Sequence, residues 1–213
     1  MKKLLIYGAR FVDTVRVVHE INACESTWEI VGFIDDDEEL ADSRMFDYPV
    51  LGNYDYLKKY IVRHPDVFVF NNVNPSITIH KLVGQRIDAL RVQVPSLISP
   101  DVNTEYVTIG RGVFIPKGCI VGCNTVIGDY VTFRYGAIAS HNVTVGEYAF
   151  LAPGSVCTSH TTIGPEAYLG TSSTTINGVT IGHGSIVGAS TLVNKDVPAG
   201  ATVIGVPARQ INQ

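Results

Sequence analysis

Three histidines stand out in the second half of this 213-residue chain, where few other side chains can carry out acid–base chemistry. They are His141, His160 and His183. The pKa of histidine lies close to neutrality, so a neutral ring can take a proton from an amine or hydroxyl that attacks a carbonyl carbon. His141 is the candidate base, and His160, nineteen residues further on, is a candidate assistant.

The elements that must position these histidines are six-residue repeats. Sixteen consecutive hexads run from Ile109 to the one that opens at Ala199, since fifteen periods of six separate the two residues. All first positions except Thr175 are apolar, and glycine follows nine of the sixteen. This pattern predicts a left-handed parallel β-helix whose coils contain three hexads each. We expect the leading residue to point inward, the small residue to relieve the bend, and the phase to hold throughout.

The hexad phase also groups the histidines. His141 and His183 both occupy third positions but lie seven hexads apart, which places them on different faces. His160 is expected one coil beyond His141, stacked over Asn142 at the same corner. No close paired spacing links the three histidines, so a zinc site is not expected.

Composition excludes several function classes. The chain has 16 Lys and Arg against 20 Asp and Glu, and a net charge of −4 without a basic run is not that of a nucleic-acid surface. The apolar run at Met1–Tyr7 is too short for a signal peptide or membrane span and is read as a first strand, which favours a soluble cytoplasmic protein. Four cysteines without Cys-x-x-Cys spacing are expected to be reduced and structural.

The first half alternates short apolar runs with helix-like stretches, which predicts a small Rossmann-like parallel α/β sheet over residues 1–98, before the β-helix over 99–213. The expected elements are strands at Lys3–Tyr7, Glu29–Ile34 and Val67–Phe70 and helices at Asp13–Ile21, Tyr54–Ile61 and Ile77–Leu90.

Ligands of such sheets bind at the carboxyl ends of the strands. One glycine in the first turn does not support a dinucleotide, but a mononucleotide fits, with Asp35 or Asp36 accepting hydrogen bonds from a ribose or base. The alternative is a solvated acidic loop.

Several motifs together resemble a known family. Ile6-Tyr7-Gly8-Ala9, Val31–Asp36 and Pro49–Gly52 precede the uninterrupted β-helix, and the most telling stretch is Ser140–Tyr148. The chain resembles the bacterial acetyl-CoA-dependent nucleotide-aminosugar N-acetyltransferases, which are related to the sialic-acid O-acetyltransferases. Its end, Val193–Pro198 and Gly205–Arg209, is similar to the common tail of coenzyme A-using hexapeptide transferases.

This resemblance implies a homotrimer with acetyl-CoA in the groove between adjacent β-helices and the nucleotide held by the first domain. It implies that His141 is the general base and that the Ser159 backbone N–H binds the thioester oxygen. The other residues carried over are Phe150, Thr171 and Ala189 for the coenzyme groove, Lys195 and Arg209 for the coenzyme phosphates, and Arg10, Phe11, Asp35, Asp36 and Asn72 for the nucleotide.

The chain departs from the family around the acceptor. Asn142 replaces the usual acidic residue after the catalytic histidine, and Phe150 replaces a common histidine. Arg134 stands in place of a frequent asparagine, Ser159-His160 in place of small residues, and Arg10-Phe11-Val12 in place of Gly-Gly-His. An amide can fix the tautomer of the ring but cannot stabilise an imidazolium electrostatically.

The function expected is transfer of acetyl from acetyl-CoA to a nucleotide-linked amino sugar, a 4-amino-4,6-dideoxyhexose for a surface polysaccharide. O-acetylation of a sugar hydroxyl is an alternative within the same fold. Ala139–Val143 also resembles the acyl-carrier-protein-dependent UDP-acylglucosamine N-acyltransferases, but those carry a helical tail beyond the position of Gln213. A non-catalytic trimeric scaffold is the alternative from another class.

Overall fold

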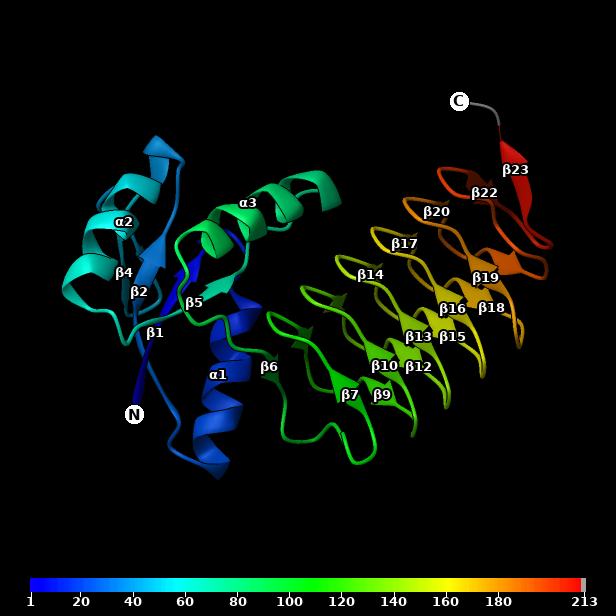
Figure 1. Cartoon of the computed structure of the whole chain (residues 1–213), viewed down its shortest axis with the longest axis horizontal. Helices are drawn as coiled ribbons and strands as arrows, with labels where there is room; N and C mark the ends of the chain where they lie inside the picture. The colour runs from blue at the N-terminus through cyan, green and yellow to red at the C-terminus, as the bar shows by residue number, and fades with distance from the viewer. Residues whose placement is uncertain (212–213) are drawn as a thin grey trace. The chain divides into compact units, whose positions relative to one another are not determined.

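A computed structural model of the chain describes residues 1–211 and separates into two compact units, Met1–Leu97 and a second unit that begins at Ile98. Figure 1 labels their elements. No helix within the described residues is long and apolar enough to cross a membrane.

The first unit is a five-stranded sheet in the order β3-β4-β2-β1-β5. Its strands are β1 (Lys2–Tyr7), β2 (Trp28–Ile34), β3 (Arg44–Met45), β4 (Tyr48–Gly52) and β5 (Phe68–Asn71), and its helices are α1 (Asp13–Cys24), the short 3₁₀ helix η1 (Glu38–Leu40), α2 (Tyr54–Arg63) and α3 (Ile77–Ala89). All pairings are parallel except that of β3 with β4. The predicted parallel α/β sheet is confirmed, and the β3-β4 hairpin was missed because β3 has only two residues.

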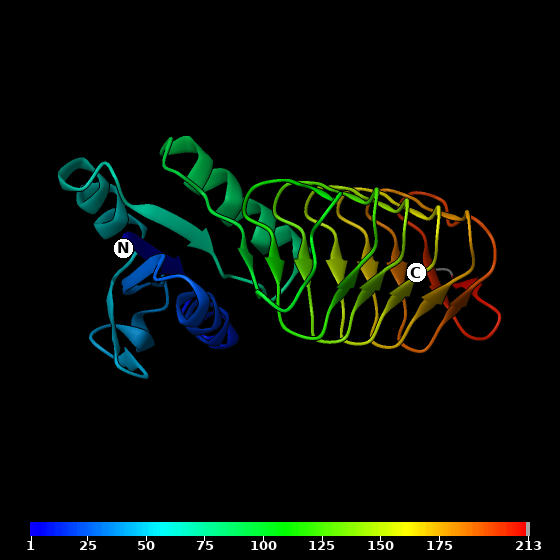
Figure 2. The same cartoon turned by 90° about the horizontal axis from the view of Figure 1, so that it is seen from below.

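Alternation along β1 divides the core of this unit between the two faces of the sheet. Leu5 and Tyr7 pack with Leu57 of α2 and with Val83 and Ile87 of α3. Successive strand residues point to opposite faces, so Leu4 and Ile6, also fully buried, face the side on which α1 lies (Figure 2).

The second unit is the predicted left-handed parallel β-helix, built from three sheets. Sheet I contains β7, β10, β13, β16 and β19, sheet II contains β6, β8, β11, β14, β17, β20, β22 and β23, and sheet III contains β9, β12, β15, β18 and β21. The strands are β6 (Leu97–Ile98), β7 (Thr108–Ile109), β8 (Phe114–Ile115), β9 (Ile120–Val121), β10 (Val126–Ile127), β11 (Thr132–Phe133), β12 (Ile138–Ala139), β13 (Thr144–Val145), β14 (Phe150–Leu151), β15 (Val156–Cys157), β16 (Thr162–Ile163), β17 (Tyr168–Leu169), β18 (Thr174–Thr175), β19 (Thr180–Ile181), β20 (Ile186–Val187), β21 (Leu192–Val193), β22 (Thr202–Ile204) and β23 (Arg209–Ile211).

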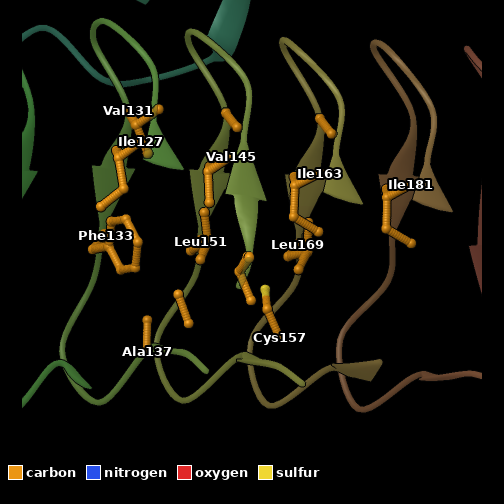
Figure 3. Packing of buried hydrophobic residues seen from close by; sticks show 14 of the residues in the cluster. Ile127, Val131, Phe133, Ala137, Val145, Leu151, Cys157, Ile163, Leu169 and Ile181 are labelled. Carbon is orange, nitrogen blue, oxygen red and sulfur yellow. The ribbon is translucent and has the colours of Figure 1, made fainter. Parts of the chain in front are cut away.

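The coils stack with a register of eighteen residues, as three hexads per coil require. Val126 pairs with Thr144, and Thr144 pairs with Thr162. The leading residues point into the core, where Ile127, Val145, Ile163 and Ile181 form one stacked column (Figure 3). Apolar columns of this kind remove the leading side chains of the hexads from water along the β-helix.

The expectation that the phase never slips is wrong at the last coil. Val187 pairs with Val203, and Ile181 forms a bridge with Val197, so the register falls from eighteen to sixteen residues. Ala199, predicted to lead the sixteenth hexad, is exposed. The turn after Val193 is two residues shorter, and within it the Asp196 carboxylate accepts a hydrogen bond from Thr180 N at 2.7 Å.

Glycine is required at these second hexad positions for a reason other than the predicted relief of a bend. The left-handed backbone lies at the fourth position, where Tyr130, Asn142 and His160 have φ of 57°, 57° and 61°. A Cβ on Gly146, by contrast, would lie 2.4 Å from Pro165 N of the next coil, and on Gly128 it would lie 2.7 Å from Glu147 N. Glycine is needed there because adjacent coils approach too closely for any side chain.

The four cysteines are free thiols. Cys24 and Cys123 are exposed, whereas Cys119 and Cys157 are buried in the β-helix. Burial raises the pKa of the Cys119 thiol to about 11 and that of Cys157 to about 12, so both stay protonated near neutral pH.

Gly146→Ala is expected to lower the free energy of unfolding by ~1–3 kcal/mol, because the coils must separate to admit the methyl group. Gly118→Asn is the matched control, since nothing lies within 4 Å of the Cβ position and asparagine tolerates its φ of +82°. Urea unfolding followed by circular dichroism measures both. A Gly146→Ala protein as stable as the wild type would contradict the close-approach explanation.

Candidate functional site

The candidate base sits at the corner where the chain passes from sheet III to sheet I. His141 follows β12 of sheet III and precedes β13 of sheet I. Ser159 is eighteen residues further on and therefore occupies the same third position in the next coil. The register of the β-helix thus places a serine hydroxyl beside the His141 ring.

Both ring nitrogens of His141 have hydrogen-bond partners. Asn142 Nδ2 lies 2.8 Å from Nδ1, and Ser159 Oγ lies 2.8 Å from Nε2. Ser140 Oγ lies 3.0 Å from Ser159 Oγ and extends the chain of hydrogen bonds. The partners are neutral, so they orient the ring without adding charge to the site.

His160 occupies the predicted corner, but its ring forms no hydrogen bond with the His141 ring. Its backbone N–H donates to His141 O at 3.3 Å, and its ring meets that of His141 edge-on, with centroids 5.5 Å apart. The sequence predicts that His160 stacks over Asn142, and the eighteen-residue register of the flanking strands confirms this. The side chain of the next coil that forms a hydrogen bond with the His141 ring is that of Ser159, and the eighteen-residue register was the available signal.

The backbone N–H of Ser159 has no acceptor among residues 1–211. It belongs to the same residue whose Oγ lies 2.8 Å from His141 Nε2. A fixed donor of this kind stabilises charge that develops on a carbonyl oxygen during acyl transfer.

His183 lies elsewhere, as predicted. Its Nε2 is 3.1 Å from Glu166 Oε1, at the corner between sheets I and II. No three metal-ligating side chains come together in the described part of the chain.

The residues expected to line the coenzyme groove lie at other places on the β-helix. Thr171 and Ala189 are exposed and occupy the same position of successive coils at the corner between sheets II and III. Phe150 projects from sheet II, stacks on Tyr168 at 5.3 Å and lies 5.9 Å from the guanidinium carbon of Arg134. One chain does not bring Thr171 and Ala189 to His141, because the two corners lie at opposite edges of sheet III.

Lys195 and Arg209 do come together. Both line a cavity of about 340 Å³ at the last coil, together with Asn194, Asp196 and Gln210. The shortened turn after Val193 and the strand β23 that folds back on β22 bring the two cations to one cavity. Two exposed cations at one cavity suit an anionic group such as a phosphate.

In the first unit, the predicted ligand residues Asp35 and Asn72 form hydrogen bonds with the backbone of the loops around them. Asp35 accepts hydrogen bonds from Ala9 N at 2.7 Å and Asp37 N at 3.0 Å, so it ties the turn after β1 to the loop after β2. The Asn72 side chain is buried and donates to Gly8 O at 2.7 Å and Phe11 O at 2.6 Å.

Asp36 also accepts hydrogen bonds, and its partners are residues that the sequence did not predict. Tyr7 Oη donates to it at 2.6 Å, Arg86 Nη1 at 3.1 Å and Tyr54 N at 2.9 Å. Burial, together with the Asp36 carboxylate, raises the pKa of Tyr7 well above its usual value. No local motif marks Tyr7 and Arg86 as partners, because they are brought to Asp36 from β1 and α3.

Arg10 pairs with Asp37 and lies 3.7 Å from Glu39. The guanidinium of Arg10 lowers the pKa of Asp37. Beside this pair, Asp35, Asp36, Asp37, Glu38 and Asn53 line a cavity of about 200 Å³ at the carboxyl ends of β2 and β4. The candidate nucleotide site is therefore an acidic pocket in which two of the carboxylates are paired with a cation, Asp37 with Arg10 and Asp36 with Arg86.

No protein-family model matches the chain. No curated protein matches it either.

Solved structures match over almost the full length. The acetyltransferase domain of PglB from Neisseria gonorrhoeae, in complex with acetyl coenzyme A, is 26% identical with a TM-score of 0.87, covering 99% of both chains. PerB from Caulobacter crescentus, in complex with CoA and GDP-perosamine, is 26% identical with a TM-score of 0.86, covering 99% of this chain and 97% of PerB. WeeI from Acinetobacter baumannii is 28% identical with a TM-score of 0.81, covering 98% of this chain and 99% of WeeI.

These structures share both the α/β unit and the β-helix with this protein, in the same order. The chain is therefore an acetyltransferase with the hexapeptide-repeat β-helix fold, and over almost its full length it is similar to the PglB domain, PerB and WeeI.

Proposed function

We propose that this protein transfers the acetyl group of acetyl-CoA to the amino group of a nucleotide-linked amino sugar, a 4-amino-4,6-dideoxyhexose used in glycan synthesis. The observation that carries the proposal is the His141 ring at a β-helix corner, held through both nitrogens by Asn142 and Ser159. The similarity to PerB, whose structure contains CoA and GDP-perosamine, supports the choice of donor and acceptor.

The chemistry follows from the groups at this corner. The neutral amine of the sugar attacks the thioester carbon, and negative charge develops on the thioester oxygen. The Ser159 backbone N–H donates to that oxygen. His141 takes the proton that leaves the amine, the carbon–sulfur bond breaks, and the thiolate of coenzyme A recovers a proton from the imidazolium.

A homotrimer completes the site. Because His141 lies at one edge of sheet III and Thr171 and Ala189 lie at the other, acetyl-CoA reaches both sets of residues in a groove between two β-helices. The outward residues of sheet III support packing against a second copy, since they are mainly apolar: Ile120, Ile138, Val156, Thr174 and Leu192. Phe150 lines the groove from sheet II, and Lys195 and Arg209 hold the coenzyme phosphates. Arg134, whose guanidinium carbon lies 5.9 Å from the Phe150 ring, contacts the acceptor substrate.

The first unit holds the nucleotide at the carboxyl ends of its strands. The contacts of Asp35, Asp36 and Asn72 support a role in shaping the loops there. Arg10 and Phe11 then face the nucleotide directly. This division assigns the predicted substrate residues to two groups, those that build the pocket and those that touch the ligand.

Thiol release from acetyl-CoA is expected with one or a few members of a panel of UDP-, dTDP- and GDP-linked 4-amino and 3-amino sugars. Mass spectrometry of the product should show an acetamide in place of the amine. Acetyl-CoA binding without release against the whole panel would instead indicate a hydroxyl acceptor, and the absence of coenzyme binding would favour the scaffold.

His141→Ala should reduce kcat by ~10² or more, because the amine loses its general base, while the Kd for acetyl-CoA stays unchanged. Steady-state kinetics and calorimetry measure the two quantities. His183→Ala is the control, since His183 pairs with Glu166 at a different corner and should leave both quantities as in the wild type. Full activity of His141→Ala would remove it from the role of base.

Lys195→Ala and Arg209→Ala should each raise the KM for acetyl-CoA ~10-fold with little change in kcat, because a charge-assisted hydrogen bond to a phosphate is worth ~1.5–3 kcal/mol. The same variants assayed with acetyl-pantetheine, which lacks the nucleotide phosphates, should match the wild type. An unchanged KM for acetyl-CoA in both variants would place the phosphates elsewhere.

A further inference from the structure

Four side chains at the active corner, the corner between sheets III and I that carries His141, form one continuous line of hydrogen bonds. Asn142 contacts His141 Nδ1, Ser159 Oγ contacts Nε2, and Ser140 Oγ contacts Ser159 Oγ, at 2.8, 2.8 and 3.0 Å. The line matters for catalysis because Nε2 is the ring nitrogen not held by the neighbouring residue Asn142, and it is already in contact with Ser159.

The hydrogen bonds along this line can run in either of two directions, and each direction is called a polarity here. With Asn142 Nδ2 toward the ring, the amide can only donate, so Nδ1 accepts and Nε2 carries the proton, which it donates to Ser159 Oγ. Ser159 then donates to Ser140. A half-turn of the Asn142 amide presents Oδ1 instead, so that Nδ1 donates to Asn142 and the Ser159 hydroxyl donates to Nε2. A carboxylate at position 142 would allow only the second polarity, whereas the amide allows both.

Only the second polarity leaves His141 able to act as a base. In that polarity the free electron pair of Nε2 already accepts the hydroxyl proton of Ser159. An amine cannot approach Nε2 at hydrogen-bond distance without displacing Ser159, which is held from its other side by Ser140 and is buried at 9% exposure. The oxygen that the acceptor meets is therefore Ser159 Oγ.

We propose that Ser159 is a catalytic relay between the acceptor and His141, an inference that rests on the proposed function. As the amine bonds to the thioester carbon, its proton passes to Ser159 Oγ while the hydroxyl proton of Ser159 passes to His141 Nε2. The carbon–sulfur bond breaks, and the imidazolium returns its proton to the coenzyme thiolate. Ser159 ends as a hydroxyl, and no acetyl-serine forms.

The test compares Ser159→Ala with Ser155→Ala. Ser155 is also a buried serine of the β-helix, and its hydroxyl has no hydrogen-bond partner within the described residues, so its loss should leave kcat unchanged. We expect Ser159→Ala to lower kcat ~10-fold to 10²-fold with an unchanged KM for acetyl-CoA, since a general-base path is worth ~10²–10⁴ and water substitutes in part for the hydroxyl.

Rates in mixtures of light and heavy water separate a relay from a structural role. The wild type should show two protons in transfer, and Ser159→Ala should show one. An unchanged kcat in Ser159→Ala, or one transferred proton in the wild type, would overturn the relay. So would an acetyl group found on Ser159 by mass spectrometry after incubation with acetyl-CoA alone, because Ser159 would then be a nucleophile.

Asn142→Asp tests the polarity that the relay needs. The carboxylate can only accept from Nδ1, so kcat should be maintained or rise. The acid limb of the pH profile of kcat/KM should move to higher pH, because a carboxylate beside the ring favours its protonated form. A tenfold or greater loss of kcat would mean that the reaction uses the opposite polarity and would overturn the relay.

The proposed function can fail independently. If the wild type turns over no amino sugar of the panel, that function is wrong, and the relay is judged on residual hydrolysis of acetyl-CoA, in which water takes the place of the amine. Slower hydrolysis by Ser159→Ala than by Ser155→Ala would support the relay there, and equal hydrolysis by both would overturn it.

Discussion

Close stacking of successive coils is the constraint on which the active corner depends. Backbones approach so closely at the second hexad position that a Cβ on Gly146 or Gly164 would lie within 2.6 Å of the next coil. This contact, together with the apolar columns inside, fixes the register at eighteen residues. The register in turn decides which side chains meet on the outside. It places the Ser159 hydroxyl in contact with the His141 ring, and it stacks His160 over Asn142.

A departure from this stacking ends the array. The register falls to sixteen residues at the last coil, where the Asp196 carboxylate accepts a hydrogen bond from Thr180 N. The chain then folds back as β23 against β22, which places Lys195 and Arg209 at one cavity. The departure from the repeat therefore creates the cationic end of the β-helix, which a strictly periodic array would not have.

The electrostatics of the two candidate sites differ. The His141 corner uses neutral partners, an amide and two hydroxyls, so orientation and the direction of the hydrogen bonds control the base. The loops of the first unit carry Asp35, Asp36 and Asp37, whose charges are met by backbone N–H groups, Tyr7, Arg86 and Arg10. Carboxylates that already accept several internal hydrogen bonds hold a loop in place more effectively than they bind a ligand.

The sequence by itself determined the β-helix, the parallel α/β sheet and the corner that carries His141. Hexad periodicity and strand–helix alternation are local patterns that burial imposes on every repeat, and they need no knowledge of distant contacts. The tertiary structure alone decided the contacts between residues far apart in the chain: Tyr7 and Arg86 on Asp36, Asn72 on the turn after β1, and the slip at Val197. These features depend on how side chains of different elements pack and on the direction of each hydrogen bond, which residue spacing along one segment does not encode.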